Sequence, residues 1–381
     1  MVIGGPPCQA YSLVGRARNK GIDGYRAEED RRHFLYEEYL KVLGMMEPQV
    51  FVMENVKGIL SSRVKGRSVF GDILEDLSDP AKAMGKRKRK GYRIHSLVHQ
   101  QEQDLLRGRG HDYIIRSEEY GIPQARHRVI LIGIREDLKA IPDTLATASD
   151  NPSVNSVLAD LPPLRSGLSK SPDSPSAWHD VIDMAVRKVA GLNSQFEMER
   201  IAERASKLTN RGAGFQIRKR RFRGKQELED WYLDHRLNGF VNHESRGHMA
   251  DDLVRYLYCA SFAKHHGGKS PRAGDFPESL APNHANWKSG KFVDRFKVQA
   301  STKPSSTITS HISKDGHYFI HPDPAQCRSL TVREAARLQT FPDNYLFEGN
   351  RTQQYVQVGN AVPPLLARQI AKIVHGVLAA G

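Results

Sequence analysis

The segment QVFVMENV, residues 49–56, constrains the fold more than any other part of the sequence. Its apolar residues follow one another without alternation and end in the polar residues Glu54 and Asn55. Such a run is typical of a strand buried on both faces of a parallel sheet. Three later stretches also have the character of strands: YRIHSLVH, YIIR and RVILIGI. A buried sheet is therefore expected within the first 140 residues.

Amphipathic stretches lie between these predicted strands. The clearest spans residues 32–47, where apolar side chains recur at helical spacing: Leu35, Tyr39, Val42, Leu43 and Met46. A short strand, MVI, opens the chain. Strands that alternate with helices predict an α/β layered sheet for residues 1–140.

The remaining sequence falls into two blocks. Residues 141–300 begin with Pro-, Ser- and Asp-rich text, which indicates a boundary, and continue as a strongly basic block whose fold the sequence does not predict. In the last block, Thr331 followed by Glu334 predicts the capping box of a helix. Pro363 and Pro364 are placed to open a final helix. The apolar residues on one face of that helix are Leu366, Ile370, Ile373, Val374 and Val377.

The charge of the chain indicates a polyanionic partner. Its 381 residues include 57 Lys and Arg but only 43 Asp and Glu, a formal net charge of +14. Nucleic acid is favoured over a membrane, because no apolar run approaches the roughly 18–20 residues that a membrane span needs. The cysteines Cys8, Cys259 and Cys327 form no CxxC pair, so we expect no zinc site and a reducing cytoplasm.

The segment GGPPCQ places a cysteine on a stiff loop directly after the first strand. Gly4 and Gly5 allow a tight turn, and Pro6 and Pro7 fix the backbone. A thiol held in this way can be aimed at a substrate. A buried structural Cys8 beside a turn is the alternative.

Glu54 and Asn55 follow the buried strand at its carboxyl end, the edge where α/β sheets bind ligands. A partly desolvated carboxyl group there is expected to have a raised pKa and to act as an acid near neutrality. A helix-capping acid is the alternative. Further along, Arg126 and Arg128 share one face of an extended segment and suit a planar acceptor or a phosphate, with a surface charge pair as the alternative.

Five segments together resemble motifs of the cytosine-5 DNA methyltransferases, in the order of that family. GGPPCQAYS resembles its nucleophile loop, MENVKG its ENV motif and QARHR its QxRxR motif. RSLTVREAARLQTFPD and QVGNAVPP resemble its last two motifs. The resemblance implies an α/β, Rossmann-like S-adenosylmethionine-dependent methyltransferase sheet with a smaller target-recognition domain. Residues 1–140 would form the catalytic domain from its fourth strand onward, residues 141–300 the target-recognition domain, and residues 301–381 a return to the catalytic domain.

The resemblance also implies a covalent mechanism on a cytosine flipped out of the duplex. Cys8 would add to carbon 6, protonated Glu54 would bind ring nitrogen 3, and Asn55 would orient the Glu54 loop. Arg128 would bind the cytosine carbonyl, with Arg126 supporting it. Further substrate contacts are expected from Pro7, Gln9, Ser12 and Gln124, and cofactor contacts from Asn360 and Val362.

The implied methyl donor is S-adenosyl-L-methionine, no metal is expected, and the implied partner is double-stranded DNA. The basic segment GFQIRKRRFRGK is interpreted as a contact to the DNA backbone, with a solvated loop as the alternative. The family's Phe-x-Gly-x-Gly loop and acidic cofactor segments are not found, so we expect an N-terminally incomplete sheet and weak activity of this chain alone. A late start, a second chain that carries these motifs and a decayed gene are the open explanations.

Two other functions remain open on the sequence. One is a non-catalytic DNA-binding subunit of a split or decayed methyltransferase, and the other is a transfer-RNA cytosine-5 methyltransferase. Restriction-modification or phage defence, in the cytoplasm and nucleoid of a bacterium or archaeon, is expected by analogy alone.

Overall fold

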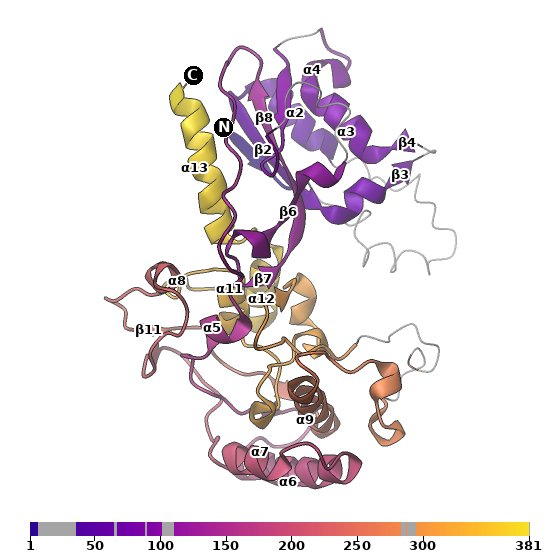
Figure 1. Cartoon of the computed structure of the whole chain (residues 1–381), viewed down its shortest axis with the longest axis vertical. Helices are drawn as coiled ribbons and strands as arrows, with labels where there is room; N and C mark the ends of the chain where they lie inside the picture. The colour runs from indigo at the N-terminus through magenta and orange to yellow at the C-terminus, as the bar shows by residue number, and fades with distance from the viewer. Residues whose placement is uncertain are drawn as a thin grey trace. The chain divides into compact units, whose positions relative to one another are not determined.

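A computed structural model describes residues 1–6, 36–64, 67–87, 90–100, 110–282, 287 and 295–380 (Figure 1). The chain divides into two compact units. The first unit comprises Met1–Tyr120, Arg126–Ala148 and Leu366–Gly381, and the second comprises Gly121–Ala125 and Ser149–Leu365. No helix in the described part of the chain is long and apolar enough to cross a membrane.

The first unit is built on a sheet whose strand order is β1-β2-β8-β5. A fifth strand, β6, also pairs with β8. The bounds of the five strands are β1 (Val2–Gly4), β2 (Val50–Val56), β5 (Tyr92–His95), β6 (Ile114–Arg116) and β8 (His127–Arg135). The predicted strands are all present, and β1 and β2 are parallel. The expectation of a parallel sheet is wrong for β8, which runs antiparallel to β2, β5 and β6. The chain returns from β6 to β8 through a short connection, and a short connection joins only antiparallel neighbours.

Helices cover both faces of this sheet. They are α2 (Tyr36–Met46), α3 (Val69–Ser78), α4 (Pro80–Ala83) and α13 (Pro364–Ala380), with 3₁₀ turns η3 (Lys57–Ser61), η5 (Gly110–Tyr113) and η6 (Ser117–Tyr120) and a small hairpin of β3 (Arg63–Val64) and β4 (Arg67–Ser68). Helices α2 and α3 share one core with Phe51, Met53 and Leu131 of the sheet. Val50 and Val52 are buried on the opposite face of β2, and Figure 1 shows α13 on the side of the sheet away from α2 and α3.

Two predicted helices are confirmed, one of them with a different buried face. Helix α13 begins at Pro364 and buries Leu366, Ile370, Val374 and Val377. Helix α2 buries Tyr39, Leu40 and Leu43, whereas Val42 and Met46 are 44% and 68% exposed. The face in contact with the sheet is rotated relative to the predicted stripe, and Leu35 lies outside the described residues.

The second unit is mainly helical. Its helices are α5 (Val154–Leu158), α6 (Pro175–Leu192), α7 (Met198–Ser206), α8 (Gln226–Tyr232), α9 (Ala250–His265), α11 (Val332–Leu338) and α12 (Arg351–Asn360). Short strands form three ladders: β7 (Gln124–Ala125) with β13 (Ser305–Ser306), β9 (Gly167–Leu168) with β12 (Gly247–His248), and β10 (Gln216–Ile217) with β11 (Gly239–Phe240). The 3₁₀ turns are η7 (Ala273–Asp275), η8 (Glu278–Leu280), η9 (Ser310–Ser313), η10 (His317–Phe319) and η11 (Pro324–Gln326).

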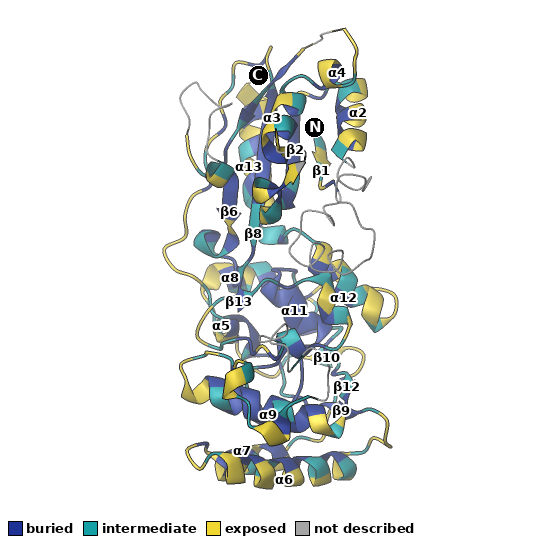
Figure 2. Cartoon of the chain, turned by 90° about the vertical axis from the view of Figure 1, so that its right-hand side faces the viewer, coloured by how far each residue is buried: buried dark blue, intermediate teal, exposed yellow. Residues whose placement is uncertain are grey.

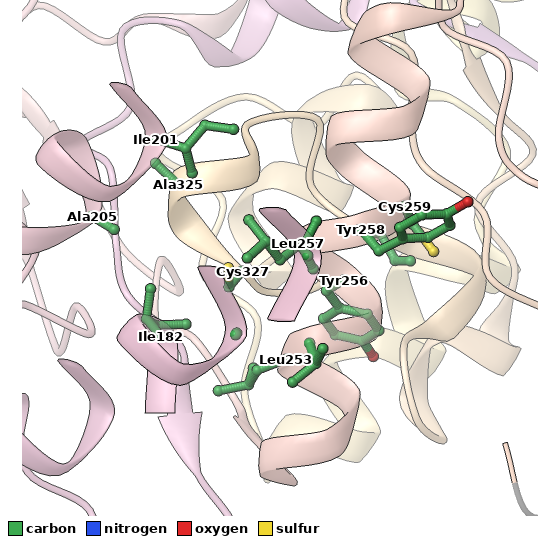
Figure 3. Close-up of a cluster of buried hydrophobic side chains, with 14 of the residues drawn as sticks. Ile182, Ile201, Ala205, Leu253, Tyr256, Leu257, Tyr258, Cys259, Ala325 and Cys327 are labelled. Carbon is green, nitrogen blue, oxygen red and sulfur yellow. The ribbon is translucent and has the colours of Figure 1, made fainter. Parts of the chain in front are cut away.

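Two apolar cores hold this unit together. In the first, α6, α7 and α9 pack against residues 320–327 (Figure 3). Cys259 and Cys327 lie inside this core as free, buried cysteines, and burial raises the pKa of both thiols. In the second, α5, α8 and α12 surround α11, which Figure 2 shows buried along its whole length.

The predicted capping box is confirmed at the start of α11. The Thr331 side chain accepts a hydrogen bond from the Glu334 N–H, and the Glu334 side chain accepts from the Thr331 N–H. Residues 301–365 belong to the second unit, so the chain rejoins the first unit at Leu366 and not near residue 301 as expected. The physical reason is that α11 shares its core with α5 and α8.

Candidate active site

The carboxyl ends of β1 and β2 lie side by side in the first unit. Gly4 pairs with Met53 in the parallel register, so the next residues in the two chains, Gly5 and Glu54, also lie side by side. A Cβ atom added to Gly5 would stand 3.3 Å from Glu54 Oε2. The strand that leads into the GGPPCQ segment therefore ends beside the Glu54 carboxylate.

Gly4 is required for close packing. A Cβ atom at this position would lie 2.4 Å from the ring of Tyr39, well inside van der Waals contact. The Tyr39 hydroxyl donates a hydrogen bond of 2.9 Å to the Val52 carbonyl, which holds the ring against β1 and β2. Gly4 is expected from the sequence to allow a tight turn, but in the structure it lies in strand β1. No sequence signal distinguishes Tyr39 from other core aromatics.

Glu54 and Arg128 form the central polar pair of the site. Strands β2 and β8 are antiparallel, and Arg128 stands opposite Val56, two residues from Glu54 and on the same face of the sheet. Arg128 Nε lies 2.9 Å from Glu54 Oε1, and the two side chains are 16% and 23% exposed. Both groups are thus partly shielded yet still accessible to a ligand.

Arg126 lies deeper than Arg128. Its side chain is buried, and its backbone is fixed to Ser117, whose Oγ accepts from the Arg126 N–H at 3.0 Å. Burial, and then the charge of Arg128, lower the pKa of Arg126 to about 9, while the attraction of Glu54 opposes the shift. Arg126 therefore remains a cation at neutral pH and contributes positive charge behind the Glu54–Arg128 pair.

Asn55 is buried, and its Oδ1 accepts a hydrogen bond of 2.8 Å from the Val56 N–H. This contact holds the main chain at the end of β2. The expectation that Asn55 orients the Glu54 segment is compatible with this contact and stays a prediction.

The other predicted substrate residues are placed differently. Pro7, Cys8, Gln9 and Ser12 lie outside the described residues. Gln124 belongs to the second unit, where it is fully buried. Its Nε2 donates to the Leu338 carbonyl at 3.1 Å and to Gln339, and its Oε1 accepts from the Ile308 N–H at 2.7 Å. The amide of Gln124 is engaged by the protein itself, so these contacts give it a structural role.

The two predicted cofactor residues lie at the end of α12, in the second unit. Asn360 is exposed, and among the described residues its side chain has no hydrogen-bond partner, whereas Val362 is half-buried. Gly359 packs closely on η9, because a Cβ atom there would lie 2.2 Å from the Ser310 nitrogen. One amide and one apolar side chain fit a peripheral contact to S-adenosylmethionine, but they do not provide the several polar groups that its carboxylate, ribose and adenine require.

The fold and the site together define an α/β enzyme with a carboxylate–guanidinium pair at the carboxyl edge of its sheet. A family model described as C-5 cytosine-specific DNA methylase matches residues 1–375. Type II methyltransferase M.Bpa9945I of Bacillus paralicheniformis is 36% identical over 99% of this chain and 70% of the relative. Type II methyltransferase M.DdeI of Desulfomicrobium norvegicum is 28% identical over 97% of this chain and 71% of the relative.

A solved structure has a similar fold. It is described as a DNA modification methyltransferase encoded within a prophage of E. coli, and it aligns with a TM-score of 0.51 at 19% identity, over 99% of this chain and 78% of that chain. The chain thus belongs to the C-5 cytosine-specific DNA methylase family. The family makes it a DNA (cytosine-5-)-methyltransferase, with DNA as substrate and S-adenosyl-L-methionine as methyl donor.

Proposed function

We propose that this chain methylates cytosine through a covalent adduct at Cys8, with Glu54 and Arg128 as the groups that hold the base. The observation that carries the proposal is the Glu54–Arg128 pair at the end of β2, next to the end of β1 that leads to Cys8. Cys8, which follows the end of β1, and Glu54, at the end of the neighbouring strand β2, can then approach opposite edges of one pyrimidine.

The roles of the chain's own residues follow from the electron flow. The Cys8 thiolate forms a bond to carbon 6 of the flipped cytosine, and the electron pair of the 5,6 double bond moves through the ring toward nitrogen 3. Glu54 delivers a proton to nitrogen 3, so that carbon 5 becomes an enamine-like nucleophile. When bound, the methyl donor would supply the methyl group to carbon 5 and leave as S-adenosylhomocysteine. A base then removes the carbon 5 proton, the 5,6 double bond forms again, and the bond between Cys8 and carbon 6 breaks to release the thiolate.

Arg128 has two alternative acceptors in this scheme. In the structure it pairs with Glu54, and the carbonyl oxygen of the base offers a second acceptor at the same edge of the sheet. Transfer of Arg128 to the base would release Glu54 Oε1 for nitrogen 3. Arg126 adds a fixed positive charge, which favours both the thiolate and the electron-rich ring.

The second unit is proposed to bind the target DNA. In the basic segment GFQIRKRRFRGK, which is predicted to contact the DNA backbone, four cations are exposed: Lys219, Arg220, Arg221 and Arg223. Phe222, between them, is buried and belongs to the core. Type II methyltransferases among the relatives support a place in restriction-modification, acting on cytoplasmic DNA. Neither of these relatives is named as half of a split enzyme, so the comparisons give no support to a second chain.

The test is covalent trapping on duplex DNA that carries 5-fluorocytosine, with S-adenosylmethionine added. Because the cofactor contacts of this chain are few, S-adenosylmethionine is supplied at high concentration. The purified chain is then expected to form, slowly, an adduct stable to denaturation, and mass spectrometry is expected to place it on Cys8. Cys8→Ala abolishes the adduct, whereas the matched variants Cys259→Ala and Cys327→Ala retain it, because both thiols are buried in the core of the second unit. DNA binding without any adduct would instead support the non-catalytic DNA-binding subunit.

A further inference from the structure

Two arginines and two aspartates form a buried cluster in the second unit. Arg337 Nε lies 2.9 Å from Asp343 Oδ1, and Arg337 Nη1 lies 2.5 Å from Asp160 Oδ1. Arg218 bridges the same two carboxylates, with its Nη2 2.5 Å from Asp343 Oδ2 and its Nη1 bonded to Asp160. The side chains of Arg337, Asp160 and Asp343 are fully buried, and that of Arg218 is 11% exposed.

Arg218 balances the charge of this cluster. Arg337 alone would leave one of two buried carboxylates uncompensated, and an uncompensated buried charge is strongly destabilising. A guanidinium can reach two carboxylates at once because its donors form a rigid fork. The cluster therefore fixes Arg218 in one position.

The chain that follows Arg218 is pinned at a second point. The Arg218 N–H donates to the Asn238 carbonyl at 3.0 Å, next to the β10–β11 ladder. Four residues later, Phe222 is buried, and the Arg337 guanidinium lies 5.8 Å from the centre of its ring. Residues 219–221 are thus held at both ends: Arg218 is fixed by the two aspartates, and Phe222 is buried beside Arg337 of the same cluster. Arg218 and Phe222 are called the two anchors of this segment.

The cations of this segment, Lys219, Arg220, Arg221 and Arg223, point outward. All four are exposed, and the described part of the chain gives none of them an ion-pair partner. Other cations of this unit are compensated: Lys207 lies 2.7 Å from Glu203, and Lys264 lies 2.6 Å from Glu197. Arg220 and Arg223 also line a cavity of about 570 Å³, together with Lys207 and Lys264. Because Lys207 and Lys264 are ion-paired, the uncompensated positive charge that a polyanion would meet here comes from the loop cations.

We propose that Arg218 is a positioning residue that pre-forms residues 219–223 as a phosphate-binding loop for the DNA backbone. This inference rests on the proposed function, which supplies DNA as the polyanion. A loop fixed at both anchors loses less conformational entropy on binding than a free one, so its cations bind phosphate more tightly.

Binding to a duplex of arbitrary sequence, measured by fluorescence anisotropy at several salt concentrations, tests the loop. The triple variant Arg220→Ala/Arg221→Ala/Arg223→Ala removes three phosphate contacts and should make the slope of log affinity against log salt shallower by about 2.7. The matched control is Arg236→Ala, an exposed arginine of the same unit that is paired only with Asp234 among the described residues and should leave the slope unchanged.

A double-mutant cycle tests the role of Arg218. Arg218→Lys keeps the charge but cannot bridge both carboxylates, and it should weaken binding about fivefold in the wild-type background. The same substitution in the triple variant should have a much smaller effect, because Lys219 is the one cation of the loop that remains to be positioned. The pair Arg218→Gln/Asp160→Asn, which keeps the cluster neutral, repeats the test if Arg218→Lys folds poorly. Thermal unfolding confirms that each variant is folded at the assay temperature.

Coupling between the Arg218 substitutions and the triple variant supports the proposal. It is overturned if the Arg218 variants lower the unfolding temperature but leave affinity unchanged, or lower affinity equally in both backgrounds. An unchanged salt slope in the triple variant also overturns it. These outcomes are separate from the proposed function, because the Cys8 adduct is measured at saturating DNA and does not require this loop.

Discussion

Replacing Arg337 with methionine should strongly destabilise the second unit. Arg337 makes four hydrogen bonds to Asp160 and Asp343 and a fifth, of 2.8 Å, to the Val157 carbonyl. In the Arg337→Met variant, the two buried carboxylates share Arg218 alone, which leaves one negative charge uncompensated. Removing one partner from a buried ion pair costs about 3–5 kcal/mol of unfolding free energy.

Urea unfolding followed by tryptophan fluorescence measures this loss. All three tryptophans, Trp178, Trp231 and Trp287, lie in the second unit, so the signal reports on that unit and avoids a two-state assumption for the whole chain. The matched control Arg236→Met removes an exposed ion pair and should change the unfolding free energy by no more than about 0.5 kcal/mol.

A second substitution separates charge from packing. Asp160→Asn in the Arg337→Met background restores neutrality and should recover part of the lost stability, although the same change in the wild-type protein is destabilising. The reasoning is refuted if Arg337→Met costs less than about 1 kcal/mol, or if Asp160→Asn destabilises both backgrounds equally.

Two further predictions concern the first strand and the pH dependence of stability. Gly4→Ala should displace the Tyr39 ring and lower the unfolding free energy by about 1–3 kcal/mol, which faster hydrogen exchange in β1 and β2 would report. The same variant should form the Cys8 adduct more slowly in the trapping assay. Gly191→Ala, where an added Cβ atom meets nothing within 4 Å, is the control, and equal exchange in both variants would contradict the packing role of Gly4. Burial lowers the pKa of His243 to about 4, so the unfolded chain binds a proton between about pH 6.5 and 4 that the folded chain does not. Stability should therefore fall as pH falls, by about 1.5 kcal/mol between pH 6.5 and 5 from this group. The urea midpoints of His243→Gln should show a correspondingly shallower pH dependence, and an unchanged dependence would rule out His243 as a source.

Much of the catalytic sheet could be predicted because its signals are local. The apolar run of β2, the proline start of α13 and the Thr331–Glu334 capping box each depend on residues within one element. The antiparallel course of β8 could not be predicted, because strand direction depends on how the chain returns to the sheet. The buried face of α2 was only partly predicted, since Val42 and Met46 match the helical period but lie away from the sheet.

By itself, the sequence determined the family and the chemistry: the order of five motifs, and the residue types that a cytosine methylation needs. The tertiary structure alone decided which of these groups meet. It brought Glu54 within 2.9 Å of Arg128, enclosed the Gln124 amide in hydrogen bonds to the Leu338 carbonyl and the Ile308 N–H, and joined Arg218 to Asp160 and Asp343. The reason is that these contacts join residues far apart in the chain, and the two-residue ladders beside Gln124 and Arg218 carry too little periodicity to be recognised in sequence.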